Sequence, residues 1–147
     1  MPRVCRSRNV AAPSDAVWDL VSDPHRLPRW WPQVQRVEEV TENAWTKVLR
    51  TPRGKTVRAD YSRVEWQPPR RLVWRQEIEE SPFEEILEEA VTRIELSADG
   101  EASTRVELCA EQELHGRYRL GGFMLRRATK RQLDEALDGI EQAVGRS

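Results

Sequence analysis

The feature that most constrains the fold of this chain is a long amphipathic segment near its C-terminus, residues 121–144. Its apolar residues recur mostly at intervals of three and four, the spacing that gathers side chains on one face of a helix. They are Leu125, Ala128, Leu133, Ala136, Leu137, Ile140, Ala143 and Val144. Charged residues between them suit a solvent-exposed face, and Gly121 and Gly122 are expected to hinge the start. A helix of this length spans roughly 36 Å, so it needs a broad apolar surface to pack against.

The segments before this helix supply that surface as predicted strands. A first strand is expected at residues 4–10, followed by a helix that begins at Pro13 and a short helical turn at 24–29. Breaks in the alternation within 34–41 and near Ser62 predict β-bulges, and Asp99-Gly100 predicts a tight hairpin turn. The later strands are expected at 34–41, 44–50, 56–66, 72–78, 83–97 and 104–114.

Alternation in the later strands separates an apolar face from a charged one. The apolar face of 72–78 carries Leu72, Trp74, Gln76 and Ile78, and that of 83–97 carries Ile86, Glu88, Ala90, Thr92, Ile94 and Leu96. One apolar and one charged face indicate an antiparallel sheet that is covered on one side only. The predicted fold is therefore α+β: a curved antiparallel sheet wrapped around the long C-terminal helix, with two short helices after the first strand.

Length and composition limit the kind of protein this can be. The chain has 147 residues, which fits a single domain over 1–147, and 38% of them are apolar and 33% charged. The formal net charge of -1 argues against a nucleic-acid partner. No apolar run is long enough for insertion into a membrane, and the first ten residues do not form a signal peptide. We therefore predict a cytoplasmic protein.

The residues that usually build metal, redox or covalent sites are sparse. Cys5 and Cys109 fit no metal or redox spacing, so we interpret them as reduced packing residues, with a disulfide between neighbouring strands as the alternative. His25 and His115 have no partners at metal-ligand spacing. No nucleophile elbow, phosphate-binding glycine loop or dinucleotide fingerprint occurs. We predict no metal and no cofactor.

Two stretches near the N-terminus resemble a known superfamily. They are residues 12–24, Ala-Pro-Ser-Asp-Ala-Val-Trp-Asp-Leu-Val-Ser-Asp-Pro, and 27–32, Leu-Pro-Arg-Trp-Trp-Pro. Together with the later strands and the last helix, they resemble the START-like or SRPBCC superfamily, in its polyketide cyclase/dehydrase and lipid transport branch. The resemblance implies a helix-grip fold, in which a seven-stranded sheet grips the last helix around a ligand cavity. It does not fix a function, since the superfamily holds cyclases, lipid carriers, hormone receptors and chaperone activators.

Candidate site residues follow from the faces expected to line such a cavity. Glu88 lies between apolar neighbours, where desolvation would raise the pKa of its carboxyl group, so it is the weak catalytic candidate. The alternative for Glu88 is a solvated or paired position at the cavity mouth. Arg58, Asp60 and Ser62 would form a polar wall only if the bulge turned them inward. The residues predicted to bind ligand are Trp31, Tyr61, Trp74, Gln76, Glu88, Thr92 and Gln112.

Three functions compete at this point. The first is binding of a small hydrophobic molecule, such as a lipid, a polyketide or another flat apolar metabolite, between the sheet and the last helix. The second is an enzyme of the cyclase/dehydrase kind, which needs an inward acid or base. The third is a protein-interaction module, suggested by the charged outer face and the apolar residues 120–125. Exposed sheet edges also leave a homodimer open.

Overall fold

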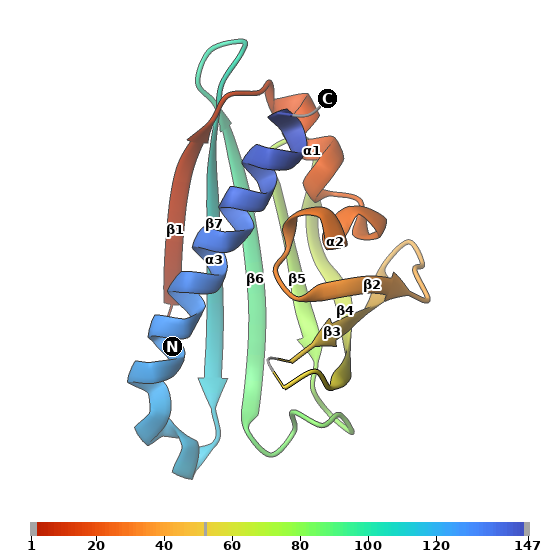
Figure 1. Ribbon diagram of the computed structural model, residues 1–147, viewed down its shortest axis with the longest axis vertical. Coiled ribbons are helices and arrows are strands. Elements are labelled where there is room, and N and C mark those ends of the chain that lie inside the picture. Colours follow the sequence, from red (N-terminus) through yellow and green to blue (C-terminus); the bar gives the residue numbers. More distant parts are fainter. Residues whose placement is uncertain (1–2, 52, 146–147) are drawn as a thin grey trace.

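The computed structural model describes residues 3–51 and 53–145 (Figure 1). Its helical elements are α1 (Ser14–Val21), η1 (Pro24–Arg26), α2 (Leu27–Trp30), η2 (Gly116–Gly121) and α3 (Gly122–Gly145). Its strands are β1 (Arg3–Val10), β2 (Val34–Glu38), β3 (Ala44–Arg50), β4 (Thr56–Gln67), β5 (Arg71–Glu77), β6 (Leu87–Ala98) and β7 (Thr104–Leu114).

The strands form one seven-stranded antiparallel sheet in the order β1-β7-β6-β5-β4-β3-β2. Helix α3 runs diagonally across one face of this sheet, and α1 and α2 lie beside its C-terminal half (Figure 1). The predicted architecture is confirmed: a curved antiparallel sheet holds the long last helix, with short helices after the first strand.

The main core lies between the sheet and the C-terminal half of α3. Alternate residues of the strands face the helix, and several of them are fully buried. Burying a large aliphatic side chain stabilises the fold by about 1.5–3 kcal/mol, so this contact fixes where the helix sits. The most buried contributors are Leu72, Ile94, Val106 and Leu108 from the strands and Leu133, Ala136, Leu137 and Ile140 from α3.

A glycine sets the closest approach between two of the helices. A Cβ atom on Gly139 of α3 would lie 2.4 Å from the backbone oxygen of Trp30 and 2.7 Å from its Cα. Backbone atoms cannot swing aside as a flexible side chain can, so only glycine allows α3 to pack this closely on α2. The apolar spacing of α3 gives no sign of this requirement.

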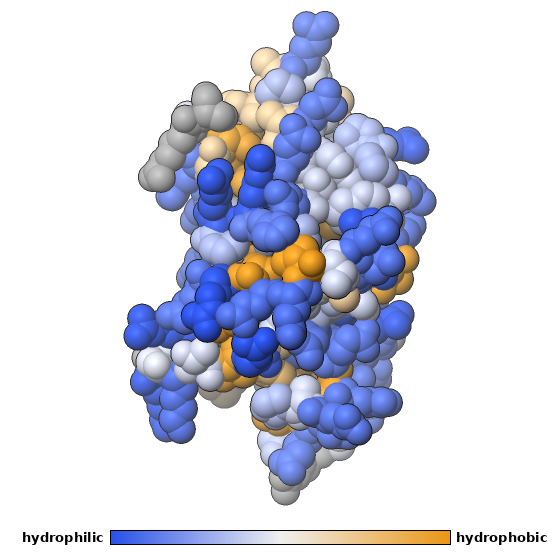
Figure 2. All heavy atoms as spheres, turned by 90° about the vertical axis from the view of Figure 1, so that its right-hand side faces the viewer, coloured by the Kyte–Doolittle hydropathy of each residue, from blue (hydrophilic) through white to orange (hydrophobic). Residues whose placement is uncertain are grey.

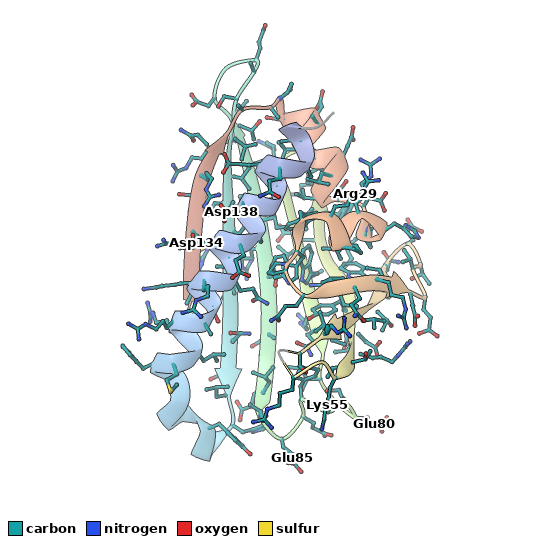
Figure 3. All side chains as sticks on the ribbon, in the orientation of Figure 1. Arg29, Lys55, Glu80, Glu85, Asp134 and Asp138 are labelled. Atoms are coloured by element: carbon teal, nitrogen blue, oxygen red, sulfur yellow. A yellow bond between two sulfur atoms is a disulfide. The ribbon has the colours of Figure 1, made fainter. Side chains whose placement is uncertain are left out.

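Ion pairs join α3 to the first strand. The guanidinium of Arg6 donates to both carboxylate oxygens of Asp134, at 2.9 and 3.1 Å. Arg8 pairs with Asp138 and, at 2.7 Å, with Glu141. Asp134 and Asp138 both lie on the side of α3 that faces β1 (Figure 3). Part of the charged face of the helix is thus a contact with the sheet.

The predicted boundaries hold for most strands, with two corrections, and a third correction concerns the buried face of α3. Strand β2 ends at Glu38, because Glu39 has a φ of 52°. Strand β6 begins at Leu87 rather than 83, because turns occupy the preceding residues. On α3, Ala128 is exposed and Thr129 is buried instead. The bulge predicted within 34–41 is confirmed, and the one expected near Ser62 lies between Arg63 and Glu65.

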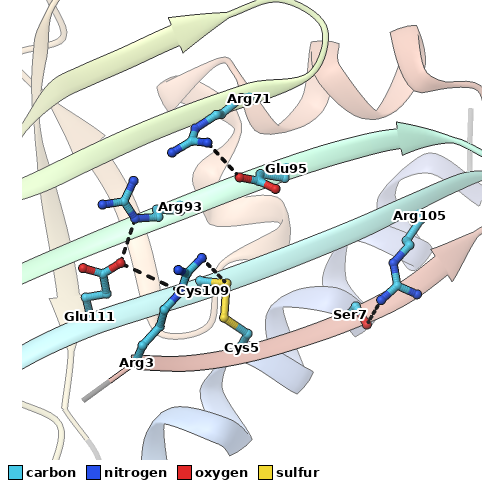
Figure 4. Close-up of a disulfide and its surroundings, with 9 residues drawn as sticks. All are labelled: Arg3, Cys5, Ser7, Arg71, Arg93, Glu95, Arg105, Cys109 and Glu111. Carbon is cyan, nitrogen blue, oxygen red and sulfur yellow. Dashed lines mark hydrogen bonds and ion pairs between the residues drawn. A yellow bond between two sulfur atoms is a disulfide. The ribbon is translucent and has the colours of Figure 1, made fainter. Parts of the chain in front are cut away.

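The interpretation of the two cysteines as reduced is wrong. Cys5 on β1 lies opposite Cys109 on β7, with their Cα atoms 4.1 Å apart, and the two form a disulfide (Figure 4). Sequence spacing cannot show this pairing, because it arises only when the first strand joins the last one. On the same outer face, Arg93 pairs with Glu111 at 2.8 Å. In the part of the chain that the structure describes, no helix is long and apolar enough to cross a membrane.

Candidate functional site

A cavity of about 310 Å³ lies between the inner face of the sheet and the N-terminal half of α3. The inner faces of β3 to β7, the end of α2 and the β5–β6 connection contribute to its walls. Its apolar lining residues are Trp31, Leu49, Phe83, Ile86, Leu87, Ala90, Val91, Ala110, Leu114 and Leu125. Its polar lining residues are Gln33, Lys47, Tyr61, Gln76, Thr92, Gln112 and Gln132. No described lining residue is acidic.

The N-terminal half of α3 is loosely attached above this cavity. Thr129 is its one buried residue among 122–132, while Phe123 and Met124 are 76% and 75% exposed. Two further hollows, of about 420 and 280 Å³, border this half of the helix and share Gln112 and Leu125 with the cavity. Figure 2, a side view, shows apolar side chains visible between hydrophilic ones at mid-height. The helix therefore covers the cavity without sealing it.

Lys47 is the unexpected residue of the site. It points inward from β3 with Trp45 and Leu49, opposite the small Ala59 on β4, and only 1% of it is exposed. Its Nζ lies 4.2 Å from the ring centre of Tyr61, and 4.5 and 4.9 Å from those of two tryptophans, Trp31 and Trp74. Burial lowers the pKa of the Lys47 amine to about 7. The three ring faces act in the opposite direction, since they stabilise the ammonium form.

The aromatic residues around Lys47 form one connected cluster. Tyr61 stacks on Trp45, with ring centres 6.4 Å apart and planes 9° from parallel. Trp74 meets Trp31 and Trp45 edge to face, each at 5.8 Å between ring centres. Burial raises the pKa of the Tyr61 hydroxyl, so this group stays protonated and can donate a hydrogen bond at neutral pH.

Two amides add polar groups to the cavity wall. Gln76 is 7% exposed and lies opposite Tyr61, and its Nε2 has no hydrogen-bond partner among the described residues. The Oε1 of Gln112 accepts a hydrogen bond from the Thr129 hydroxyl at 3.1 Å. An unpaired buried N–H is costly, so Gln76 is ready to donate to an oxygen atom of a bound molecule.

The structure brings most of the residues predicted to bind ligand to one place. Trp31, Tyr61, Gln76, Thr92 and Gln112 line the cavity. Trp74 lies behind them and reaches the site through its contact with Lys47. Whether these residues bind a ligand stays a prediction, since their position alone does not test it.

Glu88 does not face the cavity, contrary to expectation. A β-bulge between Leu87 and Glu89 shifts the alternation, so Leu87 lines the cavity and Glu88 points outward. Its carboxylate is 41% exposed and pairs with Nδ1 of His115 at 3.1 Å. Glu88 therefore occupies the paired surface position that was the alternative. Its carboxylate is therefore not placed to act as an acid or base in the cavity.

The other polar alternative also lies outside the cavity. Arg58 pairs with Glu38, and the Ser62 hydroxyl bonds to Glu77. The Asp60 carboxylate accepts from the Thr46 hydroxyl at 2.6 Å. Sequence reasoning placed no weight on Lys47. The signal was present, because alternation puts Lys47 on the same face as the apolar Trp45 and Leu49.

Comparisons with known proteins agree with this geometry. The family described as polyketide cyclase / dehydrase and lipid transport matches residues 1–145. The chain belongs to this family. A search of curated proteins finds no match.

Solved structures share the fold at low sequence identity. The Zhui aromatase/cyclase from Streptomyces sp. R1128 superposes with a TM-score of 0.82 at 18% identity, covering 99% of this chain and 94% of Zhui. The di-domain ARO/CYC protein BexL from the BE-7585A biosynthetic pathway gives 0.82 at 22%, covering 99% of this chain and 47% of BexL. A START superfamily protein from Mycobacterium smegmatis gives 0.79 at 14%, covering 98% and 97%. At these identities the likeness shows the START-like helix-grip fold alone.

Proposed function

We propose that this protein binds a small, mostly apolar and oxygen-containing molecule in the cavity between the sheet and α3. The observation that carries the proposal is a 310 Å³ cavity whose walls are mainly apolar and aromatic, with a few inward polar groups. This is the composition of sites that hold small organic ligands. The volume is small for such a site, so it favours a compact ring system over a long-chain lipid.

The polar groups specify the ligand further. Lys47, Tyr61 and the Nε2 of Gln76 all present hydrogen atoms, and the described lining has no carboxylate to balance them. A complementary ligand carries oxygen acceptors, as polyketides and other oxygenated aromatic compounds do. The aromatic side chains on the wall suit a flat ring by stacking.

A binding assay with a matched pair of variants tests this proposal. Ala90 lines the cavity and Ala102 is exposed in the β6–β7 turn. We expect Ala90→Phe to fill the cavity and abolish binding of naphthylmethanol, measured by calorimetry, while Ala102→Phe binds like the wild type. Equal binding by both variants would show that the probe sits elsewhere. Native mass spectrometry of protein from its own host would then identify any molecule that co-purifies.

A second candidate is a cyclase/dehydrase-type enzyme that uses the same cavity. The observation that favours it is that one cavity is lined by Lys47, an amine of lowered pKa, and by Tyr61, whose hydroxyl has a raised pKa, with the Lys47 Nζ 4.2 Å from the centre of the Tyr61 ring. A neutral amine can remove a proton next to a carbonyl group while a hydroxyl donates to the carbonyl oxygen. Faster deuterium exchange into a bound aromatic diketone by wild type than by Lys47→Met would support this activity.

A further inference from the structure

Lys47 is buried without the partner that a buried lysine normally has. Its side chain makes no ion pair or hydrogen bond with any residue in 3–51 or 53–145, and its amine lies over three aromatic rings. Buried charges are generally paired, because desolvation of an isolated ammonium is expensive. The site therefore favours the neutral amine, whose lone pair is free to react.

The position of the amine also suits a reaction with a bound molecule. Rings on several sides restrict the side chain, while Lys47 still forms part of the cavity wall. Burial holds the pKa of the amine at about 7, so a large fraction is deprotonated at neutral pH. A desolvated amine of this kind is the nucleophile that enzymes use against carbonyl groups.

A hydrogen-bond donor for the carbonyl oxygen lies on the neighbouring strands. Gln76 is directly opposite Tyr61, and Tyr61 is the ring closest to the Lys47 amine. The Gln76 Nε2 is buried and has no hydrogen-bond partner among the described residues, although its side chain lines the cavity. Gln76 and Lys47 line the same cavity, so a carbonyl compound bound there is exposed to both groups.

We propose that Lys47 is a nucleophile that captures an aldehyde or ketone ligand as an imine, with the carbonyl oxygen held by Gln76. The Nζ lone pair forms a C–N bond as the C–O π bond breaks, and one N–H proton passes to the oxygen to give a carbinolamine. The hydroxyl group then leaves with the second N–H proton as water, and a C=N bond remains. No oxidant or reductant is needed. This inference rests on the proposed ligand-binding function and names the carbonyl compounds as its ligand class.

The lysine content of the chain makes the test unusually clean. It has three lysines, Lys47, Lys55 and Lys130, and the last two are exposed. Lys55 lies in the loop at one end of the molecule (Figure 3). The wild-type protein is incubated at neutral pH with naphthaldehyde and cyanoborohydride, which reduces an imine to a stable amine and leaves the free aldehyde largely intact, and the labelled peptides are mapped. Binding of naphthylmethanol, which has the same rings and no carbonyl group, is measured in parallel.

We expect the naphthylmethyl group at Lys47 at least tenfold above Lys55 and Lys130, and labelling at Lys47 that naphthylmethanol suppresses. Lys47→Met is expected to lose this labelling, and its cooperative urea unfolding shows that the variant is folded. The exposed Lys55→Met should keep both the labelling at Lys47 and the binding of naphthylmethanol. Equal labelling of all three lysines by a protein that binds naphthylmethanol would overturn the imine proposal and leave the proposed binding function intact. Tight binding of naphthoate without labelling of Lys47 by the aldehyde would also overturn the imine proposal, because it would mean that Lys47 only pairs with anions. Failure of all probes to bind would overturn both proposals.

Discussion

Replacing Lys47 by methionine should make the protein more stable, although it removes a side chain from the centre of the candidate site. Methionine has a similar length and no charge to desolvate. The wild type must bury an amine whose pKa falls from 10.5 to about 7. At about 1.4 kcal/mol per pKa unit, this shift corresponds to roughly 5 kcal/mol, from which the ring faces recover about 1–2 kcal/mol. We expect Lys47→Met to raise the free energy of unfolding by about 3–4 kcal/mol at neutral pH.

The pH dependence distinguishes this cause from simple repacking. Above the folded pKa, Lys47 is neutral in the folded protein, whereas the unfolded chain still binds the proton until about pH 10.5. Wild-type stability therefore rises with pH relative to Lys47→Met, by about 1.4 kcal/mol per pH unit in this window. The other titratable group of the described cavity lining, Tyr61, keeps its proton over the same range because burial raises its pKa.

Urea unfolding followed by tryptophan fluorescence measures the effect. The two proteins are compared at several pH values from neutral to about pH 9.5, within the window between the two pKa values. The exposed Lys55→Met serves as the control, and its stability should stay within about 0.5 kcal/mol of the wild type. A constant difference between Lys47→Met and wild type across this range would refute the reasoning, because it would mean that the Lys47 amine keeps its ordinary pKa.

Three further predictions concern the packing of α3 on α2, the disulfide and the surface position of Glu88. Gly139→Ala should lower the free energy of unfolding, measured with urea, by at least about 1–3 kcal/mol, because the added Cβ would clash with the Trp30 backbone. The control Gly122→Ala should be nearly neutral, because a Cβ there has no atom within 4 Å. Replacing both Cys5 and Cys109 by serine should lower the free energy of unfolding by about 2–5 kcal/mol, because the disulfide closes a loop with a sequence separation of 104. An unchanged free energy of unfolding would contradict this prediction. Glu88→Gln should leave the affinity for naphthylmethanol, measured by calorimetry, unchanged, because Glu88 does not line the cavity. A tenfold loss of affinity would show that Glu88 contacts the ligand after all.

The sequence carries the architecture well because periodicity reports burial directly. The alternation of Leu72, Trp74 and Gln76 and the helical spacing of Leu133, Leu137 and Ile140 each mark the face that the structure buries. These patterns extend over many residues, so a single exception such as Ala128 does not change the result. Features that depend on two distant segments carry no such signal. The disulfide and the close approach at Gly139 are of this second kind.

The candidate site was predictable only in part, for a related reason. Residues on regular strands, such as Gln76 and Thr92, fall where alternation places them. Glu88 does not, because one extra residue at the bulge after Leu87 reverses the facing of its side chain. Lys47 was passed over because lysine usually lies at the surface, and burial of its amine depends on rings from three other segments.

The order of the strands also decides when the molecule can be completed during synthesis. From β2 to β7, each strand pairs with the next one in the chain, so the sheet can grow as successive hairpins leave the ribosome. Strand β1 is synthesised before the other strands but borders only β7, so the Cys5–Cys109 disulfide can form only after β7 has been made. Until then β1 is an unpaired strand, and its arginines, Arg3, Arg6 and Arg8, disfavour pairing with other chains. In the folded protein the same arginines form ion pairs with Glu111 and with α3. The charges that disfavour pairing with other chains before β7 is made thus attach β1 to β7 and to the helix afterwards.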